Sequence, residues 1–282
     1  MNIKIGISIL IAIPLLHSTS FAKNNQKDFK KDFHGNVKII TTTSFEAISN
    51  FDKNTKGKDL GTTIDIYDIR GNHLESQSLE LNKKISTIKY EYVNNSTRLL
   101  KFTNFDERGS ITNMGIYKYP KKNYQEFMYL NPNGSQILIQ MNNLDDRDNV
   151  LIKKVYSNGL LTSNVLSDYN LKNRILSTKE SDKYSGKETF YKYENDYLIE
   201  MLNVISFSDG KIISKFTYSY NSNGNLINKK IFEDNDMSFN SDIEYTKFDL
   251  QKNWLEKIEI PRLMDKHWGG FKKIVQRKIE YF

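Results

Sequence analysis

The chain of 282 residues contains no cysteine and only four histidines. The lack of cysteine excludes a thiol nucleophile, a disulfide bond and lipid attachment through a cysteine. His34, His73 and His267 lie in three distant segments, and none has a second histidine at metal-site spacing. The G-x-S-x-G, H-E-x-x-H and phosphate-binding-loop patterns are absent as well. The sequence therefore predicts no cofactor and no local catalytic motif, although a Ser-His-Asp site assembled from distant residues stays open.

Long apolar runs are also absent, except at the start of the chain. Lys4 precedes an uncharged apolar run of twelve residues, 5–16, and Ser20-Phe21-Ala22 has the small-x-small pattern of a cleavage site. A membrane-spanning helix needs roughly twenty such residues. Residues 1–22 are therefore predicted to be a signal peptide, residues 23–32 a flexible polar leader and residues 33–282 a single domain. We expect an exported protein, periplasmic or extracellular, with no transmembrane segment after cleavage.

Neither sign of charge is in large excess. Removal of residues 1–22 leaves 40 basic and 34 acidic residues, a net charge of +6 that is well mixed along the chain. This balance favours weak attraction to anionic surfaces and does not indicate a nucleic-acid groove. A protein or an anionic envelope component is the partner class that the charge leaves open.

Tyrosine and phenylalanine are plentiful, and they alternate with polar residues. The step Tyr-x-Tyr occurs at Tyr90/Tyr92, Tyr117/Tyr119, Tyr191/Tyr193 and Tyr218/Tyr220, with lysine or glutamate between the first three pairs. Residues two apart share one face of a strand but not of a helix. The spacing therefore predicts strands with one aromatic face. A sheet that leaves this face uncovered would offer it to a protein or a sugar, whereas a sheet that curls over it makes it a core.

A turn follows many of these strands, with the pattern aromatic, three residues, turn residue, one residue, apolar. It reads Phe105-DER-Gly109-Ser-Ile111 and Tyr220-NSN-Gly224-Asn-Leu226. Glycine and asparagine suit a turn that needs positive φ. Lys252 stands at this position in the last unit, where we expect a strained or differently shaped turn. Short connections of this kind join antiparallel neighbours, so the pattern predicts a meander of hairpins.

The aromatic-Asp-x-x-Gly-x-apolar unit resembles the tyrosine-aspartate (YD) repeat of the RHS family. Residues 67–71 (YDIRG) and 105–109 (FDERG) carry the resemblance best, and it extends over 33–282. The opening and closing segments resemble those of secreted bacterial proteins with degenerate repeats of this type. In large RHS proteins such repeats form a shell around a toxin domain. This chain is short for such a shell, so the expected fold is all-β: an antiparallel hairpin meander forming an open, curved sheet. Residues 260–270 are expected to form a loop with a helical turn.

Two segments are candidate binding sites. Asp145, Asp146 and Asp148 lie in one acidic turn, and several oxygens in one turn suit Ca²⁺. The competing interpretation is a hairpin turn with helpful Asx side chains. Near the C-terminus, aromatic and basic side chains adjoin, and they would bind an anionic glycan, a lipid headgroup or an acidic partner, or else cover the last sheet edge. These candidates are Lys266, His267, Trp268, Phe271, Lys272 and Lys273. His73 follows a turn glycine, which predicts an exposed residue at a strand end.

Three functions are consistent with the sequence. The repeats without a local catalytic motif favour an exported, non-enzymatic binding or structural protein. The RHS resemblance implies a partner-specific role, such as immunity against a secreted toxin. A third hypothesis is an enzyme that acts on envelope glycans with carboxylates paired across strands.

Overall fold

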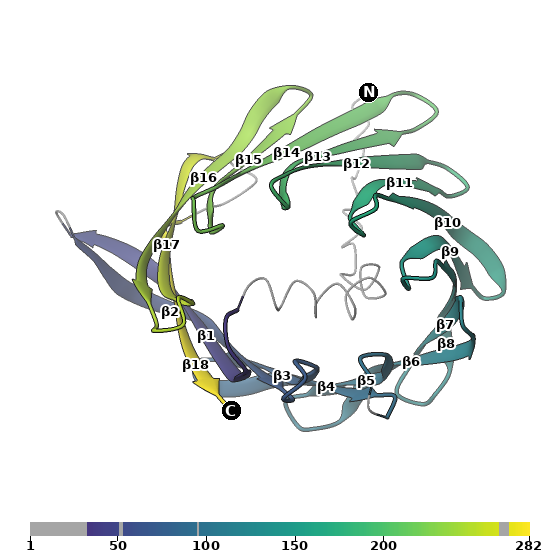
Figure 1. Cartoon of the computed structure of the whole chain (residues 1–282), viewed down its shortest axis with the longest axis horizontal. Helices are drawn as coiled ribbons and strands as arrows, with labels where there is room; N and C mark the ends of the chain where they lie inside the picture. Colours follow the sequence, from purple (N-terminus) through teal and green to yellow (C-terminus); the bar gives the residue numbers. More distant parts are fainter. Residues whose placement is uncertain (1–32, 51–52, 95, 265–270) are drawn as a thin grey trace, which may run out of the picture.

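The computed structural model describes residues 33–50, 53–94, 96–264 and 271–282, and these residues form one antiparallel sheet of eighteen strands. Figure 1 shows the strands arranged as a ring. Within these ranges no helix has the length and the apolar character needed to cross a membrane. The predicted signal peptide and leader lie outside the described residues. The strands in chain order are β1 (Val37–Asn50), β2 (Lys53–Tyr67), β3 (His73–Glu80), β4 (Lys83–Tyr92), β5 (Leu99–Asp106), β6 (Ile111–Lys121), β7 (Tyr124–Leu130), β8 (Gln136–Leu144), β9 (Val150–Ser157), β10 (Leu160–Tyr169), β11 (Ile175–Ser181), β12 (Gly186–Glu194), β13 (Tyr197–Ser206), β14 (Lys211–Tyr220), β15 (Leu226–Glu233), β16 (Asp236–Phe248), β17 (Trp254–Met264) and β18 (Lys273–Tyr281).

The sheet is closed, and the expectation of an open sheet is wrong. Each strand pairs with the next one in the chain, and β18 pairs with β1 across the register Thr42↔Arg277 and Ile40↔Ile279. An open sheet would leave the N–H and C=O groups of two edge strands without partners. Closure pairs them, and the even number of strands makes the closing pair antiparallel like the rest. The meander was predicted correctly. Residues 260–264, expected in a loop, continue β17.

One face of the sheet carries the aromatic side chains. Direct cross-strand pairs run from Tyr90 to Phe102, from Phe102 to Gly115 and from Tyr117 to Phe127. Because directly paired residues project to the same side, these residues belong to one face, which we call the aromatic face. The predicted Tyr-x-Tyr alternation is confirmed. The same face continues through β8 to β18 and includes most of the buried apolar side chains.

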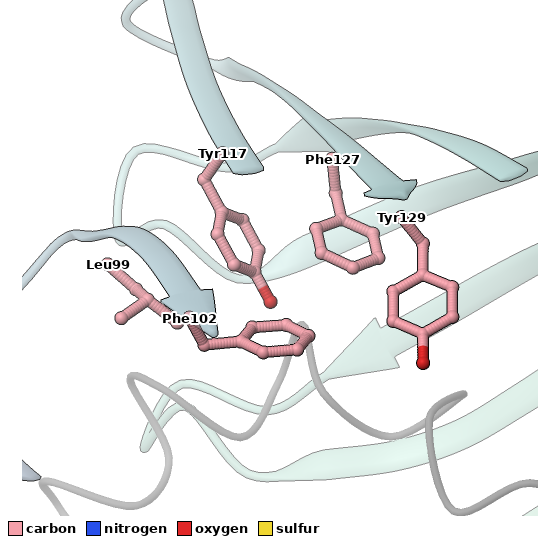
Figure 2. Close-up of a cluster of buried hydrophobic side chains, with 5 residues drawn as sticks. All are labelled: Leu99, Phe102, Tyr117, Phe127 and Tyr129. Atoms are coloured by element: carbon pink, nitrogen blue, oxygen red, sulfur yellow. The ribbon is translucent and has the colours of Figure 1, made fainter. Parts of the chain in front are cut away.

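The tightest packing lies on the aromatic face of β5, β6 and β7. Figure 2 shows five side chains projecting to the same side of these strands, Leu99, Phe102, Tyr117, Phe127 and Tyr129. The ring centroids of Tyr117 and Phe127 are 4.7 Å apart. Gly115 leaves room for them, because a Cβ there would lie 2.6 Å from Phe127 Cε2. Side chains converge on the concave side of a curved sheet, so this crowded face is the inner face of the ring.

The opposite face carries charges in cross-strand pairs. Lys101 Nζ lies 3.3 Å from Glu91 Oε1, and Lys179 Nζ lies 2.8 Å from Glu188 Oε1. Both pairs are directly opposed in the register, Glu91↔Lys101 and Lys179↔Glu188. These side chains are largely exposed, so water screens the attraction within each pair. Their position shows that charged groups stand on the outer face of these strands.

The aspartate of the repeat unit caps its turn. Asp106 Oδ1 accepts hydrogen bonds from the backbone N–H groups of Arg108 (2.9 Å) and Ser110 (2.8 Å). The same two bonds, to the second and fourth following residues, recur at Asp68, Asp145, Asn170 and Asn221. The residue between them adopts positive φ, and Lys252 does so at 68°, as its strained turn was predicted to require. That conformation costs a residue with a β-carbon about 1–2 kcal/mol.

The tyrosine of the unit links the two strands of its hairpin at their open end. Tyr92 near the end of β4 donates its hydroxyl proton to the carbonyl of His73 at the start of β3, 2.9 Å away. Equivalent bonds join Tyr119 to Leu99, Tyr169 to Val150, Tyr220 to Leu198 and Tyr245 to Leu226. All five lie at the rim where even-numbered strands end. The ring packs on the inner face while its hydroxyl satisfies a backbone acceptor, so tyrosine suits the position better than phenylalanine.

An asparagine at the end of some turns links neighbouring turns along this rim. Asn72 Nδ2 donates to the Ser96 carbonyl, and Asn149 Nδ2 donates to Asn173 Oδ1. The last turn uses its asparagine to reach the first described segment. Asn253 Nδ2 donates to the His34 carbonyl (2.8 Å), and Asn253 Oδ1 accepts from the His34 N–H (2.7 Å). The link that joins successive turns elsewhere thus closes the ring.

Substitution of this asparagine tests the closure. Asn253 is 3% exposed, so Asn253→Ala removes the hydrogen bonds of a buried amide to His34 and Tyr281 and should lower the free energy of unfolding by about 2 kcal/mol in urea titrations. Asn225 occupies the same turn position and is half-buried. Its N–H donates to Asn221 Oδ1, but its side chain forms no hydrogen bond to another residue in the described ranges. Asn225→Ala should therefore cost less than about 0.5 kcal/mol. Equal losses in the two variants would show that the Asn253 link does not stabilise the closed ring.

Candidate functional site

The acidic turn predicted as a Ca²⁺ loop is a capped hairpin turn. Asp145 Oδ1 accepts the N–H groups of Arg147 and Asn149, both at 2.8 Å, and Asp145 Oδ2 accepts Asn149 Nδ2 at 2.7 Å. Asp148 occupies the positive-φ position, with φ of 61°. The competing interpretation of this segment, a turn with Asx side chains, describes the structure.

The three carboxylates of this turn do not converge. Asp146 Oδ1 lies 3.1 Å from Lys122 Nζ, and Asp148 Oδ1 lies 3.2 Å from an Arg98 nitrogen. Their oxygens are thus directed to different donors. Over the described ranges, no group of three or more histidine, aspartate or glutamate side chains is placed to hold a metal ion. A Ca²⁺ role for Asp145, Asp146 and Asp148 stays a prediction.

The C-terminal candidates are only partly described. Lys266, His267 and Trp268 lie outside the described residues. Phe271 is 44% exposed, and Lys273 Nζ lies 5.4 Å from the centroid of its ring. The Lys272 carbonyl accepts the Ala47 N–H at 2.8 Å, so this segment borders β1 at the closing strand pair. A binding role for these residues stays a prediction.

A polar and aromatic cluster that the sequence did not predict lies around His73. The His73 ring stacks between Tyr67 and Tyr90, with centroid distances of 4.9 and 4.7 Å. Its Nε2 lies 3.1 Å from Asp65 Oδ1. His73 begins β3, as predicted, but the prediction that it is exposed is wrong, because the register pairs Tyr67 with His73 across the turn on the inner face. The aromatic residue before the turn was the signal that could have placed the imidazole beside a ring.

The hydrogen bonds of this cluster do not form a nucleophilic triad. Ser76 Oγ donates to Asp65 Oδ1 at 2.7 Å, the same oxygen that faces His73. In a Ser-His-Asp site the histidine lies between the serine and the aspartate. Here Asp65 lies between the other two, so His73 is not placed to activate Ser76. The arrangement orients the imidazole and holds β2 against β3.

The inner face of β12 to β16 is more open than the face near β6. Tyr191, Phe216 and Tyr218 are half-buried, whereas Tyr117 and Phe127 are buried. Cross-strand pairs connect Tyr191 to Met201, Met201 to Phe216 and Phe216 to Ile231. We call the half-buried inner residues of β12 to β16 the open arc. Burial, and then the neighbouring Tyr191, raise the pKa of Tyr218, so its hydroxyl is neutral at physiological pH.

Lysines lie at both ends of the open arc. Lys229 pairs directly with Tyr218, and its Nζ is 5.9 Å from the centroid of Phe216. Lys187 pairs with Ile205 at the other end of the same strands. In the part of the chain that the structure describes, neither lysine forms an ion pair with a carboxylate. Lys229 has no carboxylate directly opposite it in the register, whereas Lys187 is opposite Glu180 on β11. The arc combines aromatic surface with these lysines, and it is the candidate binding site.

Comparison with known proteins identifies no family for this chain. No family model matches the sequence, and no curated protein matches it. Among solved structures, a porin-like protein from Bacteroides uniformis is similar over 88% of this chain and 98% of its own, with 10% identity and a TM-score of 0.45. The TcdB2-TccC3-Cdc42 and TcdB2-TccC3 structures match 83% and 81% of this chain with TM-scores of 0.32 and 0.28, at 11% and 9% identity. This chain spans less than a fifth of those two proteins, 18% and 17%.

The buried tyrosines around His73 predict a loss of stability in alkali. Burial, and then the charge of Asp65, raise the pKa of Tyr90 to about 12, while burial is also the main cause that raises the pKa values of Tyr67 and Tyr92. An unfolded tyrosine ionises near pH 10. The neutral buried hydroxyl of Tyr90 therefore contributes fully to stability below pH 10. As the pH rises from 10 to 12, its ionisation in the unfolded chain should lower the free energy of unfolding by about 1.4 kcal/mol per pH unit.

Tyr90→Phe should make that decline shallower, because the variant has no hydroxyl to ionise at this position. The measurement is the free energy of unfolding in urea at intervals from pH 9 to pH 12. Tyr184 is 78% exposed, so Tyr184→Phe should keep the decline of the unmodified protein. A Tyr90→Phe variant with an unchanged decline would show that burial of this hydroxyl does not govern alkaline stability.

Proposed function

We propose that this protein is an exported, non-enzymatic binding protein that holds its ligand on the open arc of the inner face. The observation that carries the proposal is the contrast within the inner face. Aromatic side chains pack fully near β6 but stay half-buried from β12 to β16. Closed sheets of 16 to 18 strands are wide enough to enclose an aqueous interior. A half-buried aromatic surface in such an interior is suited to recognition rather than to packing alone.

The outer face supports a protein that works in water. Charged side chains stand near the middle of many strands and pair across them, as Lys179 and Glu188 do. We infer that the exported chain acts in the periplasm or outside the cell.

A catalytic role has less support than a binding role. The cluster of Asp65, His73 and Ser76 directs Ser76 and His73 to a single oxygen of Asp65. Binding requires only the half-buried rings and the lysines of the open arc. A partner-specific role, such as toxin immunity, falls within the proposal if the ligand is a protein.

A matched pair of substitutions tests the proposal. Residues 23–282 serve as bait for envelope extract, and retained molecules are identified by mass spectrometry. Tyr191 faces the interior, and its neighbour Phe190 faces outward and is 46% exposed. Tyr191→Ala should abolish retention of the ligand, whereas Phe190→Ala should retain it. Capture that depends on Phe190 and not on Tyr191 would place the site on the outer face and contradict the proposal.

A further inference from the structure

We propose that the ligand of the open arc is an acidic polysaccharide. This inference rests on the proposed function and specifies its ligand class. It follows from the order of side chains along the inner face of β12 to β15: a lysine, a row of hydroxyl and amide groups, a row of aromatic and apolar groups, and a second lysine.

The two lysines are far apart. Lys229 on β15 is directly opposite Tyr218 on β14. The register across β13 places Tyr193 of β12 at the same height as Tyr218, and Tyr193 is six residues from Lys187 along β12. Six residues of strand span about 20 Å. Lys187 and Lys229 are also separated by the width of three strand spacings, about 14 Å. A small anion cannot reach both ammonium groups, whereas a polymer with repeated acidic groups can.

The surface between the lysines has the chemistry of sugar recognition. Thr189, Asn203 and Ser214 are paired in sequence across β12, β13 and β14. Thr189 is 4% exposed, so the polar groups open to a ligand are those of the half-buried Asn203 and Ser214. Thr189 Oγ1 donates to Asn203 Oδ1 at 2.9 Å. This bond uses the carbonyl oxygen of the Asn203 amide and not its amide protons. Hydroxyl and amide groups can exchange hydrogen bonds with sugar hydroxyls because both donate and accept.

The adjacent row supplies aromatic surface. Tyr191 and Phe216 lie on either side of Met201 in the cross-strand register, and both rings are half-buried. A sugar presents a C–H face that packs on such rings, while its hydroxyls remain free for the polar row. An acidic peptide would satisfy the lysines but has less use for a row of hydroxyl groups beside a row of rings.

The charge of the inner face agrees with an anionic ligand. On the outer face Lys179 has a glutamate as its direct cross-strand partner. On the inner face Lys229 is directly opposite Tyr218 and Ser241. Lys187 is directly opposite Ile205 and Glu180, and Glu180 Oε1 accepts the Ser163 hydroxyl proton at 2.7 Å. Glu233 on the inner face of β15 is exposed at the rim and is opposite Ser214. A lysine without an ion-pair partner inside a concave surface attracts carboxylate, sulfate or phosphate groups.

The experiment measures calorimetric binding of residues 23–282 to oligogalacturonate, which carries carboxylates, and to heparin, which carries sulfates. Neutral dextran and poly-glutamate of similar length are the comparison ligands.

Lys229→Gln and Lys187→Gln remove inner charges. Lys230→Gln and Lys192→Gln remove outer charges from adjacent or nearby positions on the same strands, with the same change in net charge. Each inner variant should weaken binding of an acidic glycan about tenfold, since it removes a charged hydrogen bond to the ligand. The outer variants should bind as the unmodified protein does.

Three results would overturn the inference: no binding of either acidic glycan, equal losses in inner and outer variants, or binding of poly-glutamate as tight as that of the glycans. These results leave the proposed function separately testable. If the envelope bait still retains a molecule that Tyr191→Ala releases, the open arc binds a ligand of another class. If Tyr191→Ala releases nothing, the proposed function fails as well.

Discussion

The backbone pairing between β1 and β18 is the constraint on which the rest of the structure depends. The chain has no cysteine, so no covalent bond holds its two ends together. Nine residue pairs, from Val37↔Tyr281 to Glu46↔Lys273, join them instead. Without this pairing the sheet would have two free edges, its curvature would not be fixed, and the aromatic face would be open to water along its length. Closure converts a meander into a ring with an inner and an outer face.

The side chains of the repeat unit stabilise the turns and the strand pairs. The binding surface that we propose therefore lies between the units. The aspartate of the unit caps the turn, its glycine or asparagine adopts positive φ, and its tyrosine bonds the carbonyl at the start of the preceding strand. Asp106, Gly109 and Tyr92 illustrate these three parts. Because these side chains are used in the turns and at the rim, the binding site that we propose lies among the inner residues in the middle of the strands, with Tyr191, Phe216 and Lys229.

The sequence predicted features that depend on neighbouring residues, such as strand alternation and turn conformation. It did not predict closure of the ring, which depends on the whole sheet. The alternation at Tyr117/Tyr119 and the turn at Lys252 follow from two-residue periodicity and φ preference, and both were predicted correctly. Closure depends on the number of strands and the curvature summed over all of them, which no single segment encodes. His73 was misjudged because its surroundings come from cross-strand register rather than from its neighbours in sequence. The open arc was not singled out, since the degree of burial separates it from other tyrosine-bearing strands only after the ring is formed.

The most direct test of the account is the chemical accessibility of single cysteines introduced into this cysteine-free chain. Ser214 faces the interior on β14, and Thr217 on the same strand faces outward; both are half-buried. Ser214→Cys and Thr217→Cys variants would be treated with a small maleimide and with a maleimide carrying a 5 kDa polyethylene glycol chain. A closed ring with the aromatic face inward predicts that the small reagent modifies both cysteines, while the large one modifies Thr217→Cys much faster than Ser214→Cys. Equal rates with the large reagent would contradict closure, and slower reaction at Thr217→Cys would show that the faces are reversed.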